Sequence, residues 1–252
     1  MTTQDKAQQS NTEHVLPVAV ITGAGRRLGL HMTASLLARG WRVIGLTRHC
    51  GQGALAELNS DNLICIEYDA LDDSSVEAAI NAVLHRTQNI DLVLHNASIY
   101  ERDALHADAS AAFYDDLFAI HMKLPARLNR ALSGALQRSV REQGNIIHIT
   151  DIYADNPNPD YALYCSTKAG SENLMKSFAK LLAPRVRVNA IQPGPVKFLA
   201  EHTPAQKAAV LGETLLASEG GFGALEKAIY AILDNHYMTG SVLRIDGGRA
   251  LS

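Results

Sequence analysis

The feature of this sequence that most restricts its fold is a regular alternation of short apolar runs with longer amphipathic stretches. The runs are rich in β-branched residues and predict strands, and the stretches between them have helical spacing. Strands and helices that alternate in this way form a parallel sheet covered on both faces. The predicted strands are Val18–Thr22, Arg42–Thr47, Leu63–Tyr68, Leu92–His95, Asn145–Thr150, Arg187–Gln192 and Val242–Ile245. The predicted helices are Leu28–Ala38, Ser74–His85, Ser110–Leu136, Ala162–Leu182 and Gly221–Leu233.

The alternation continues to the end of the sequence without a linker, so we expect one domain over residues 15–252. This α/β domain is predicted to be of the Rossmann type, a doubly wound parallel sheet of about seven strands. Residues 1–14 are polar and lack a signal pattern, which predicts a flexible tail. Two predicted helix boundaries agree with this fold. Gly40 is placed as a left-handed cap after the first helix, and Ser74 with Glu77 has capping-box spacing at the start of the second.

Charge and hydropathy exclude several classes of function. Lysine and arginine number 23 against 26 aspartate and glutamate, a net charge of −3, which does not favour nucleic acid as a partner. No apolar run approaches the roughly 20 residues of a membrane helix, so we expect no membrane partner and a cytoplasmic protein.

Cysteine and histidine patterns also restrict the chemistry. The cysteines Cys50, Cys65 and Cys165 are odd in number and show no close pairing, so we expect neither a disulfide framework nor a zinc site. The histidines show no metal-binding spacing, and no metal is predicted.

A glycine-rich segment follows the first predicted strand and leads directly into a helix. Its glycines are Gly23, Gly25 and Gly29. Backbone N–H groups of such a turn can approach a pyrophosphate, and the helix N-terminus favours the negative charge. Glycines with this spacing also occur in plain tight turns. At the first strand-to-helix turn of an alternating chain, however, we favour dinucleotide binding.

The end of the second predicted strand indicates which dinucleotide binds. A carboxylate here would accept from the ribose 2′-hydroxyl of NAD, but the residue is Arg48, with Arg26 nearby in sequence. Guanidinium groups suit a 2′-phosphate, so we expect NADPH. The alternative for Arg48 is a solvated charge at a strand end. Asp69, at the end of the third strand, could accept from the adenine amino group or could simply form a turn.

Tyr164 and Lys168 carry the strongest chemical signal. Four residues apart on a helix, they share one face, and we expect the ammonium to lower the phenol pKa and make Tyr164 a proton donor. Asp151 ends the fifth predicted strand, at the edge where the ligand should lie. Tyr161 is the rival aromatic residue, and we expect it to pack.

At this point the chain resembles the short-chain dehydrogenase/reductase family from about Pro17 onward. The matching pieces are Thr22 to Gly29, Asn96-Ala97, Tyr164-x-x-x-Lys168, Pro193-Gly194 and Asp246-Gly247-Gly248. The resemblance implies a cofactor-binding set of Gly23, Arg26, Arg27, Leu28, Arg48, Asp69, Asn96, Ala97, Tyr164, Lys168, Pro193 and Gly194.

Three departures from the family pattern narrow the resemblance. Arg27 replaces a glycine, Ser98 replaces the glycine of Asn-Ala-Gly, and Asp151 replaces the catalytic serine. All three are typical of the pteridine reductases, and the chain is most similar to the bacterial dihydromonapterin reductases. The resemblance implies that Ser98 contacts a pterin and that Tyr100 covers it. It also implies that Arg27 bridges substrate and cofactor. The resulting substrate-binding set is Arg27, Ser98, Tyr100, Asp151 and Tyr164, with Asp151, Tyr164 and Lys168 delivering protons.

The aspartate also has a chemical reason. A serine hydroxyl can donate to a ketone oxygen, whereas an ionised Asp151 can only accept. An acceptor suits a substrate that offers N–H groups or a ring nitrogen that needs a relayed proton. Asp151 therefore favours C=N reduction over carbonyl reduction. The alternative is that it caps the loop after its strand.

His121 stands where many family members have an asparagine whose backbone carbonyl holds a water near the catalytic lysine. Pro125, four residues later, has no N–H for that carbonyl. We therefore expect the helix to kink and His121 to serve the proton relay through its backbone, which places it in the predicted catalytic set. Its imidazole could equally be packing.

These observations predict an NADPH-dependent reductase of a dihydropterin such as dihydromonapterin, with dihydrofolate as a further substrate. Hydride would reach C6 and a proton N5. Two alternatives stay open: a carbonyl or acyl-carrier ketoreductase of the same family, and a non-catalytic NADPH-sensing protein. The resemblance also implies a homotetramer or homodimer.

Overall fold

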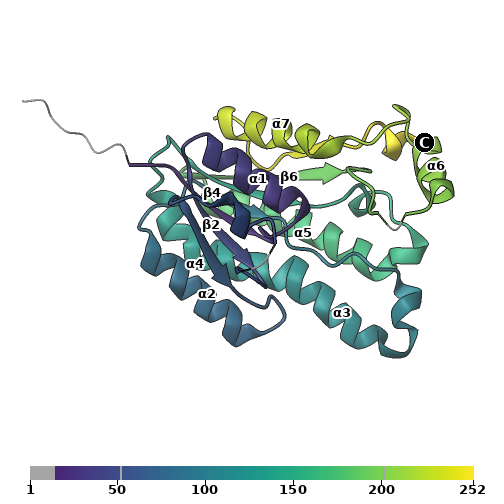
Figure 1. Ribbon diagram of the computed structural model, residues 1–252, viewed down its shortest axis with the longest axis horizontal. Coiled ribbons are helices and arrows are strands. Elements are labelled where there is room, and N and C mark those ends of the chain that lie inside the picture. Colours follow the sequence, from purple (N-terminus) through teal and green to yellow (C-terminus); the bar gives the residue numbers. More distant parts are fainter. Residues whose placement is uncertain (1–14, 52, 201) are drawn as a thin grey trace, which may run out of the picture.

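The computed structural model describes residues 15–51, 53–200 and 202–252, and the predicted tail lies outside the described residues. Seven strands form one parallel sheet in the order β3-β2-β1-β4-β5-β6-β7 (Figure 1). The strands are β1 Val18–Thr22, β2 Arg42–Thr47, β3 Leu63–Glu67, β4 Leu92–His95, β5 Gly144–Ile149, β6 Val186–Pro193 and β7 Val242–Ile245. The predicted doubly wound α/β sheet is confirmed.

Helices lie against both faces of this sheet (Figure 1). The helices are α1 Arg27–Ala38, α2 Asp73–Arg86, α3 Ser110–Phe118, α4 Leu124–Gln137, α5 Ala162–Leu182, α6 Pro204–Gly212 and α7 Gly221–Asp234. Helices α1 and α7 share one core with the sheet, and α2, α4 and α5 share the other. Helix α3 packs against α5 through Phe113 and Leu117.

The strands supply both cores because successive side chains point to opposite faces. In β1, Val18 and Val20 belong to the α2/α4/α5 core, whereas Ala19 and Ile21 belong to the α1/α7 core. All five residues of β1 are buried. A strand covered on both faces must be apolar throughout, which is the pattern that identified it in the sequence.

The chain changes direction across the sheet between β1 and β4, which are paired neighbours. At such a switch point the loops after the two strands lead away from each other and leave a crevice for a ligand. The glycine turn follows β1, and Asn96 to Tyr100 follow β4. The topology therefore brings the predicted cofactor turn and the predicted substrate residues to one edge.

Two local predictions need correction, and one helix was missed. Helix α2 is capped by Asp72, whose side chain accepts from the Ser74 N–H, so the predicted capping box at Ser74 and Glu77 is wrong. The predicted helix 110–136 is interrupted by a π-helical turn at Ala119–Lys123. Helix α6 was not predicted. Gly40, with φ 78°, does form the expected left-handed turn after α1.

No helix in the described part of the chain is both long and apolar enough to cross a membrane.

Candidate active site

The glycine turn after β1 is packed too closely for side chains. Gly23 has φ +67°, and a Cβ atom on Gly29 would lie 2.1 Å from the Gly23 carbonyl oxygen. The N–H groups of Gly23 and Ala24 donate to the Leu46 carbonyl at the end of β2. The bare backbone of this turn meets the first turn of α1, whose leading N–H groups have no partner within the helix. Such a cradle fits the pyrophosphate of a dinucleotide.

Asn96 and Ala97 fix the turn from β4. Both of their N–H groups donate to Thr22 Oγ1, at 2.9 and 3.1 Å. The Asn96 side chain donates to the carbonyl oxygens of Thr22 and Gly23, at 3.1 and 3.2 Å. Asn96 thus holds the backbone of the glycine turn in place. Leu28 directs its side chain into the α1/α7 core, and its N–H lies in the first turn of α1.

Arg27 begins α1 with φ 51°, the left-handed backbone region that glycine adopts easily. Its side chain is exposed and donates to the Lys197 carbonyl at 2.7 Å. Phe222 lies beneath it, with its ring centroid 5.7 Å from the guanidinium carbon. Arg27 therefore links the glycine turn to the segment that follows β6. Pro193 ends β6 and Gly194 begins that segment, where the Gly194 N–H donates to the carbonyl of Ile245 in β7.

Arg26 and Arg48 are exposed at the same edge. Their chain neighbours Gly25 and Thr47 are in contact, since a Cβ on Gly25 would lie 2.6 Å from Thr47 Oγ1. The two arginines thus flank one contact between the glycine turn and β2. Asp69 is also exposed, and its side chain accepts from the Leu71 N–H at 3.0 Å, as a turn former does.

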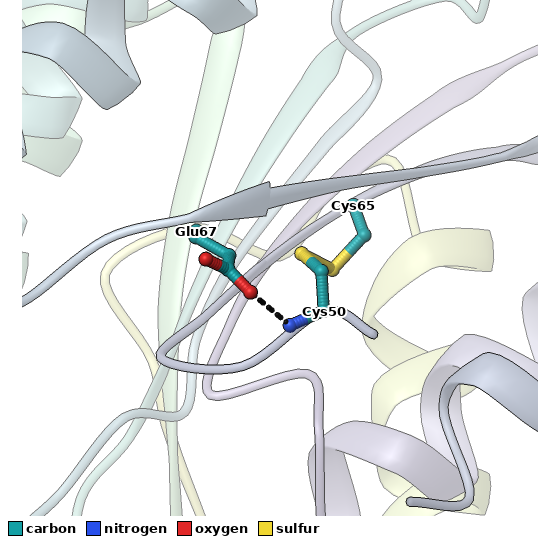
Figure 2. The surroundings of a disulfide bond; sticks show 3 residues. All are labelled: Cys50, Cys65 and Glu67. Atoms are coloured by element: carbon teal, nitrogen blue, oxygen red, sulfur yellow. Dashed lines mark hydrogen bonds between the residues drawn. A yellow bond between two sulfur atoms is a disulfide. The ribbon is translucent and has the colours of Figure 1, made fainter. Parts of the chain in front are cut away.

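A disulfide joins Cys50 to Cys65, with their Cα atoms 5.7 Å apart (Figure 2). Cys65 lies in β3, and Cys50 lies in the loop after β2 and donates its N–H to Glu67 at 2.7 Å. The prediction that cysteines form no disulfide is wrong: an odd count excludes no single pair, and neighbouring strands bring residues 15 apart together. Cys165 is free and buried.

Tyr164, Lys168 and Asp151 come together where β5 ends beside α5. The Tyr164 hydroxyl donates to Asp151 Oδ2 at 2.9 Å, and the Tyr153 N–H donates to Asp151 Oδ1 at 2.9 Å. Lys168 Nζ donates to the Ile149 carbonyl at 3.1 Å and lies 5.4 Å from the centroid of the Tyr164 ring. Asp151 does cap the loop after its strand, and it contacts the phenol as well.

Burial dominates the acid–base behaviour of this group. It raises the pKa of Asp151 and lowers the pKa of Lys168 to about 8. Burial and the neighbouring Asp151 carboxylate raise the pKa of Tyr164 well above its ordinary value. The expectation that Lys168 lowers the phenol pKa is therefore wrong for this arrangement, because burial, and after it Asp151, raises that pKa. Tyr164 remains a hydrogen-bond donor.

Aromatic rings cover Tyr164. Tyr100, half exposed, stacks on Tyr161 with ring centroids 4.7 Å apart and meets Tyr164 edge-on at 5.1 Å. Tyr161 packs, as predicted. Tyr100 is thus placed at the mouth of the site, where a planar ring could stack on it.

His121 lies behind Tyr164, buried and edge-on to its ring, with the centroids 5.4 Å apart. Helical structure is continuous from α3 through Pro125 into α4 and widens into the π turn, in which the Leu124 N–H donates to the Ala119 carbonyl. The imidazole does more than pack, because its nitrogens contact Ser98 Oγ at 2.8 Å and a threonine hydroxyl, Thr167 Oγ1, at 2.9 Å.

Sequence reasoning did not identify Thr167, Tyr153 or Lys197. Thr167 lies three residues after Tyr164 on α5, a spacing at which a hydroxyl can reach a backbone carbonyl one turn back. Tyr153 and Lys197 act through their backbone, which carries no sequence signal. Across residues 15–51, 53–200 and 202–252, no group of three His, Cys, Asp or Glu side chains could hold a metal ion.

A family model described as short chain dehydrogenase matches residues 17–208. The chain belongs to the short-chain dehydrogenase family. As a member of this family it is an oxidoreductase, and the edge that holds Asp151, Tyr164 and Lys168 is its candidate active site.

Relatives of this short-chain dehydrogenase include dihydromonapterin reductases. The one from Klebsiella pneumoniae is 30% identical over 232 residues, which cover 92% of this chain and 96% of the relative. The one from Escherichia coli O6:K15:H31 is 32% identical over 241 residues, 94% of this chain and 97% of the relative.

Solved structures with the same fold include FolM alternative dihydrofolate reductase 1 from two Brucella species. The Brucella canis protein, complexed with NADP, superposes with a TM-score of 0.83 at 26% identity and covers 94% of each chain. The Brucella suis protein, also in complex with NADP, gives 0.81 at 27% identity, over 94% of this chain and 96% of that one.

Proposed function

We propose that this short-chain dehydrogenase is an NADPH-dependent dihydropterin reductase that converts a dihydromonapterin-like substrate, and dihydrofolate more slowly, to the tetrahydro form. The dihydromonapterin reductases at 30–32% identity and the two FolM structures support this assignment. The reductases match this chain in sequence, and the FolM structures match it in fold, over almost their whole length. The substrate class itself rests on the site.

The observation that carries the proposal is the Asp151 carboxylate hydrogen-bonded to the Tyr164 hydroxyl. A ketone oxygen that becomes an alkoxide needs donors around it, and an ionised carboxylate repels it. A C=N nitrogen is basic and becomes an N–H group as the carbon is reduced, so a carboxyl group beside it can pass it a proton and then accept from that N–H group. Burial raises the pKa of Asp151, which favours the form of its carboxyl group that holds such a proton.

The residues present fit NADPH. The glycine turn and the first N–H groups of α1 would hold the pyrophosphate, and the exposed Arg26 and Arg48 would hold the 2′-phosphate. No carboxylate stands in the place of Arg48 to repel that phosphate. NADPH supplies the hydride when it is bound.

The chain's own residues supply the proton for N5. Because the pKa of Tyr164 is raised well above its ordinary value, the carboxyl group of Asp151 releases a proton more readily than the phenol does. Tyr164 and the Tyr153 N–H then stabilise the carboxylate by donating to it. Lys168 lies beside the pair and recharges it with a proton from solvent. Tyr100 covers the ring from outside.

The test is NADPH consumption by the purified protein with dihydromonapterin, dihydrobiopterin, dihydrofolate and a simple diketone in parallel. We expect turnover of the dihydropterins and none of the diketone. Diketone reduction without pterin reduction would assign the protein to the ketoreductases and reject the role given to Asp151.

A second experiment separates catalysis from sensing. Tyr164→Phe should abolish most turnover, while the variant should still bind NADPH, measured by cofactor fluorescence. Tyr237→Phe is the matched control, since Tyr237 is 93% exposed. A wild-type protein that binds NADPH and reduces none of the four substrates would support the sensing alternative.

We further propose that the protein forms a homodimer or homotetramer. Support comes from the exposed aromatic side chains of α3, where Tyr114 is 40% and Phe118 is 51% exposed beside α5. Exposed aromatic rings on a helix pair are typical of protein interfaces.

A further inference from the structure

A chain of three hydrogen bonds lies behind Tyr164 and runs from Ser98 to the Tyr164 carbonyl. Ser98 Oγ contacts His121 Nε2 at 2.8 Å, and His121 Nδ1 contacts Thr167 Oγ1 at 2.9 Å. Thr167 Oγ1 contacts the Tyr164 carbonyl oxygen at 2.8 Å. The chain joins the loop after β4 to α5 through the π turn that carries His121.

The contact at the far end of this chain, from Thr167 to the Tyr164 carbonyl, favours one placement of the protons. The Tyr164 carbonyl can only accept, so Thr167 donates its single hydroxyl proton there. Thr167 Oγ1 therefore accepts from His121, which places a proton on Nδ1. Burial and the nearby Lys168 ammonium lower the pKa of His121 well below its ordinary value, so the imidazole is neutral and Nε2 carries a lone pair.

With the proton of His121 on Nδ1, the shorter of two contacts decides the near end of the chain. Ser98 donates its hydroxyl proton to His121 Nε2. The other available acceptor, the Ile99 carbonyl, lies 3.3 Å away. Donation to Ile99 would leave the Nε2 lone pair facing a Ser98 lone pair at 2.8 Å, and it would leave a buried nitrogen without a donor.

We propose that His121 is a positioning residue that makes the Ser98 hydroxyl a hydrogen-bond acceptor toward the active site, so that the site selects a heterocycle offering an N–H group. This inference rests on the proposed function for the identity of the heterocycle. Ser98 is placed to act on a ligand: it is partly exposed, follows the residues that hold the glycine turn, and precedes Tyr100 by two positions.

The consequence is selectivity. A serine hydroxyl that rotates freely can donate to a ketone or accept from an amine. With its proton held by His121, Ser98 offers only lone pairs toward the active site. A dihydropterin carries N–H groups that can donate to Ser98, whereas a diketone would place an oxygen lone pair against it.

The direct test is the tautomer of His121, measured by ¹⁵N NMR on protein labelled at histidine nitrogens. His121→Gln identifies the His121 signals. We expect an uncharged ring protonated at Nδ1 from about pH 6 to 8. Protonation at Nε2, or a charged imidazolium in that range, would reverse the Ser98 hydrogen bond and overturn the inference. The measurement needs no substrate, so it is independent of the proposed function.

The kinetic test compares two variants of His121. Gln can donate to Thr167 through its amide and accept from Ser98 through its carbonyl, whereas Leu can do neither. We expect His121→Leu to raise KM for dihydromonapterin about 10- to 100-fold, with KM for NADPH unchanged, and His121→Gln to restore most of the loss. Equal effects of Gln and Leu would overturn the inference, because a purely structural role would not distinguish them by hydrogen bonding.

A double-mutant cycle with Ser98→Ala completes the test. If His121 acts through Ser98, His121→Leu has little further effect on KM once Ser98 is alanine. An undiminished effect in the Ser98→Ala background contradicts the inference. A wild-type protein that reduces no dihydropterin would reject the proposed function, and the tautomer measurement would still decide the hydrogen-bond chain.

Discussion

Among single residues, Asp151 is the proposed source of the proton for N5. An asparagine in its place keeps the shape and one acceptor oxygen but holds no transferable proton. We expect Asp151→Asn to lower kcat for dihydromonapterin about 100- to 10,000-fold, the usual contribution of a general acid. Steady-state kinetics checks kcat, and fluorescence titration should show unchanged NADPH affinity. A variant with wild-type kcat would show that the proton for N5 comes from elsewhere.

Lys168 predicts the pH dependence. Burial lowers its pKa to about 8, so the ammonium form dominates below that pH and is lost above it. Because the ammonium recharges the Asp151–Tyr164 pair, kcat should fall as pH rises through about 8. The measurement is a pH profile of kcat with both substrates saturating. A profile that stays flat or rises across this range would exclude Lys168 as the proton source.

Arg48 should decide between NADPH and NADH. Loss of a charge-assisted contact to the 2′-phosphate weakens binding by about 10- to 100-fold. We therefore expect Arg48→Ala to raise KM for NADPH by that factor without raising KM for NADH. Arg42→Ala is the matched control, because Arg42 is an exposed arginine at the opposite end of β2. Equal effects on both cofactors would place the 2′-phosphate elsewhere.

At the scale of elements, the disulfide ties the loop after β2 to β3. Closing a loop of 15 residues stabilises a fold by about 3 kcal/mol through the unfolded chain. Cys50→Ser should therefore lower the free energy of unfolding, measured in urea, by about that amount. A reducing agent should lower it similarly in the wild type and should not affect the variant. If reduction leaves wild-type stability unchanged, the two cysteines are not bonded in solution.

How far the elements follow from the sequence depends on how local their causes are. Strand β4 and helix α5 match the predicted bounds because their periodicity is uninterrupted. Helix α6 was missed although Thr203 and Gln206 form a capping box, since none of its residues is buried and it lacks the pattern of a core-facing helix. The start of α2 was misplaced because Asp72, Ser74 and their neighbours offer competing caps.

The candidate site also has features that could be predicted from the sequence and features that could not. Tyr164, Lys168 and Asp151 could be predicted because helical spacing and a strand end place them together. Three features could not be predicted: the hydrogen bonds among these residues, the disulfide, and the hydrogen-bond chain through His121. Each depends on contacts between segments that are separated in the sequence. The direction of the Tyr164 pKa shift was wrong for that reason.

For the whole molecule, the testable property is assembly. Light scattering should give a particle mass of two or four times 27.2 kDa. Phe118→Asp, which places a charge among exposed aromatic side chains, should shift the mass toward that of one chain while the circular dichroism of the fold is retained. A monomeric wild type would remove the proposed role of the α3 surface.

The π turn at Ala119–Lys123 has a consequence for how the gene of this protein can change. Helix α4 keeps Leu124, Leu128 and Leu132 against the sheet, although it follows a turn that holds one residue more than an α-helix. Deleting a single codon in this stretch would turn the segment into regular α-helix and rotate α4 by about 100° against α3. Either the leucines or His121 would then leave its place. Insertions and deletions here should therefore be rarer than substitutions, even though the stretch reads in sequence as ordinary helix.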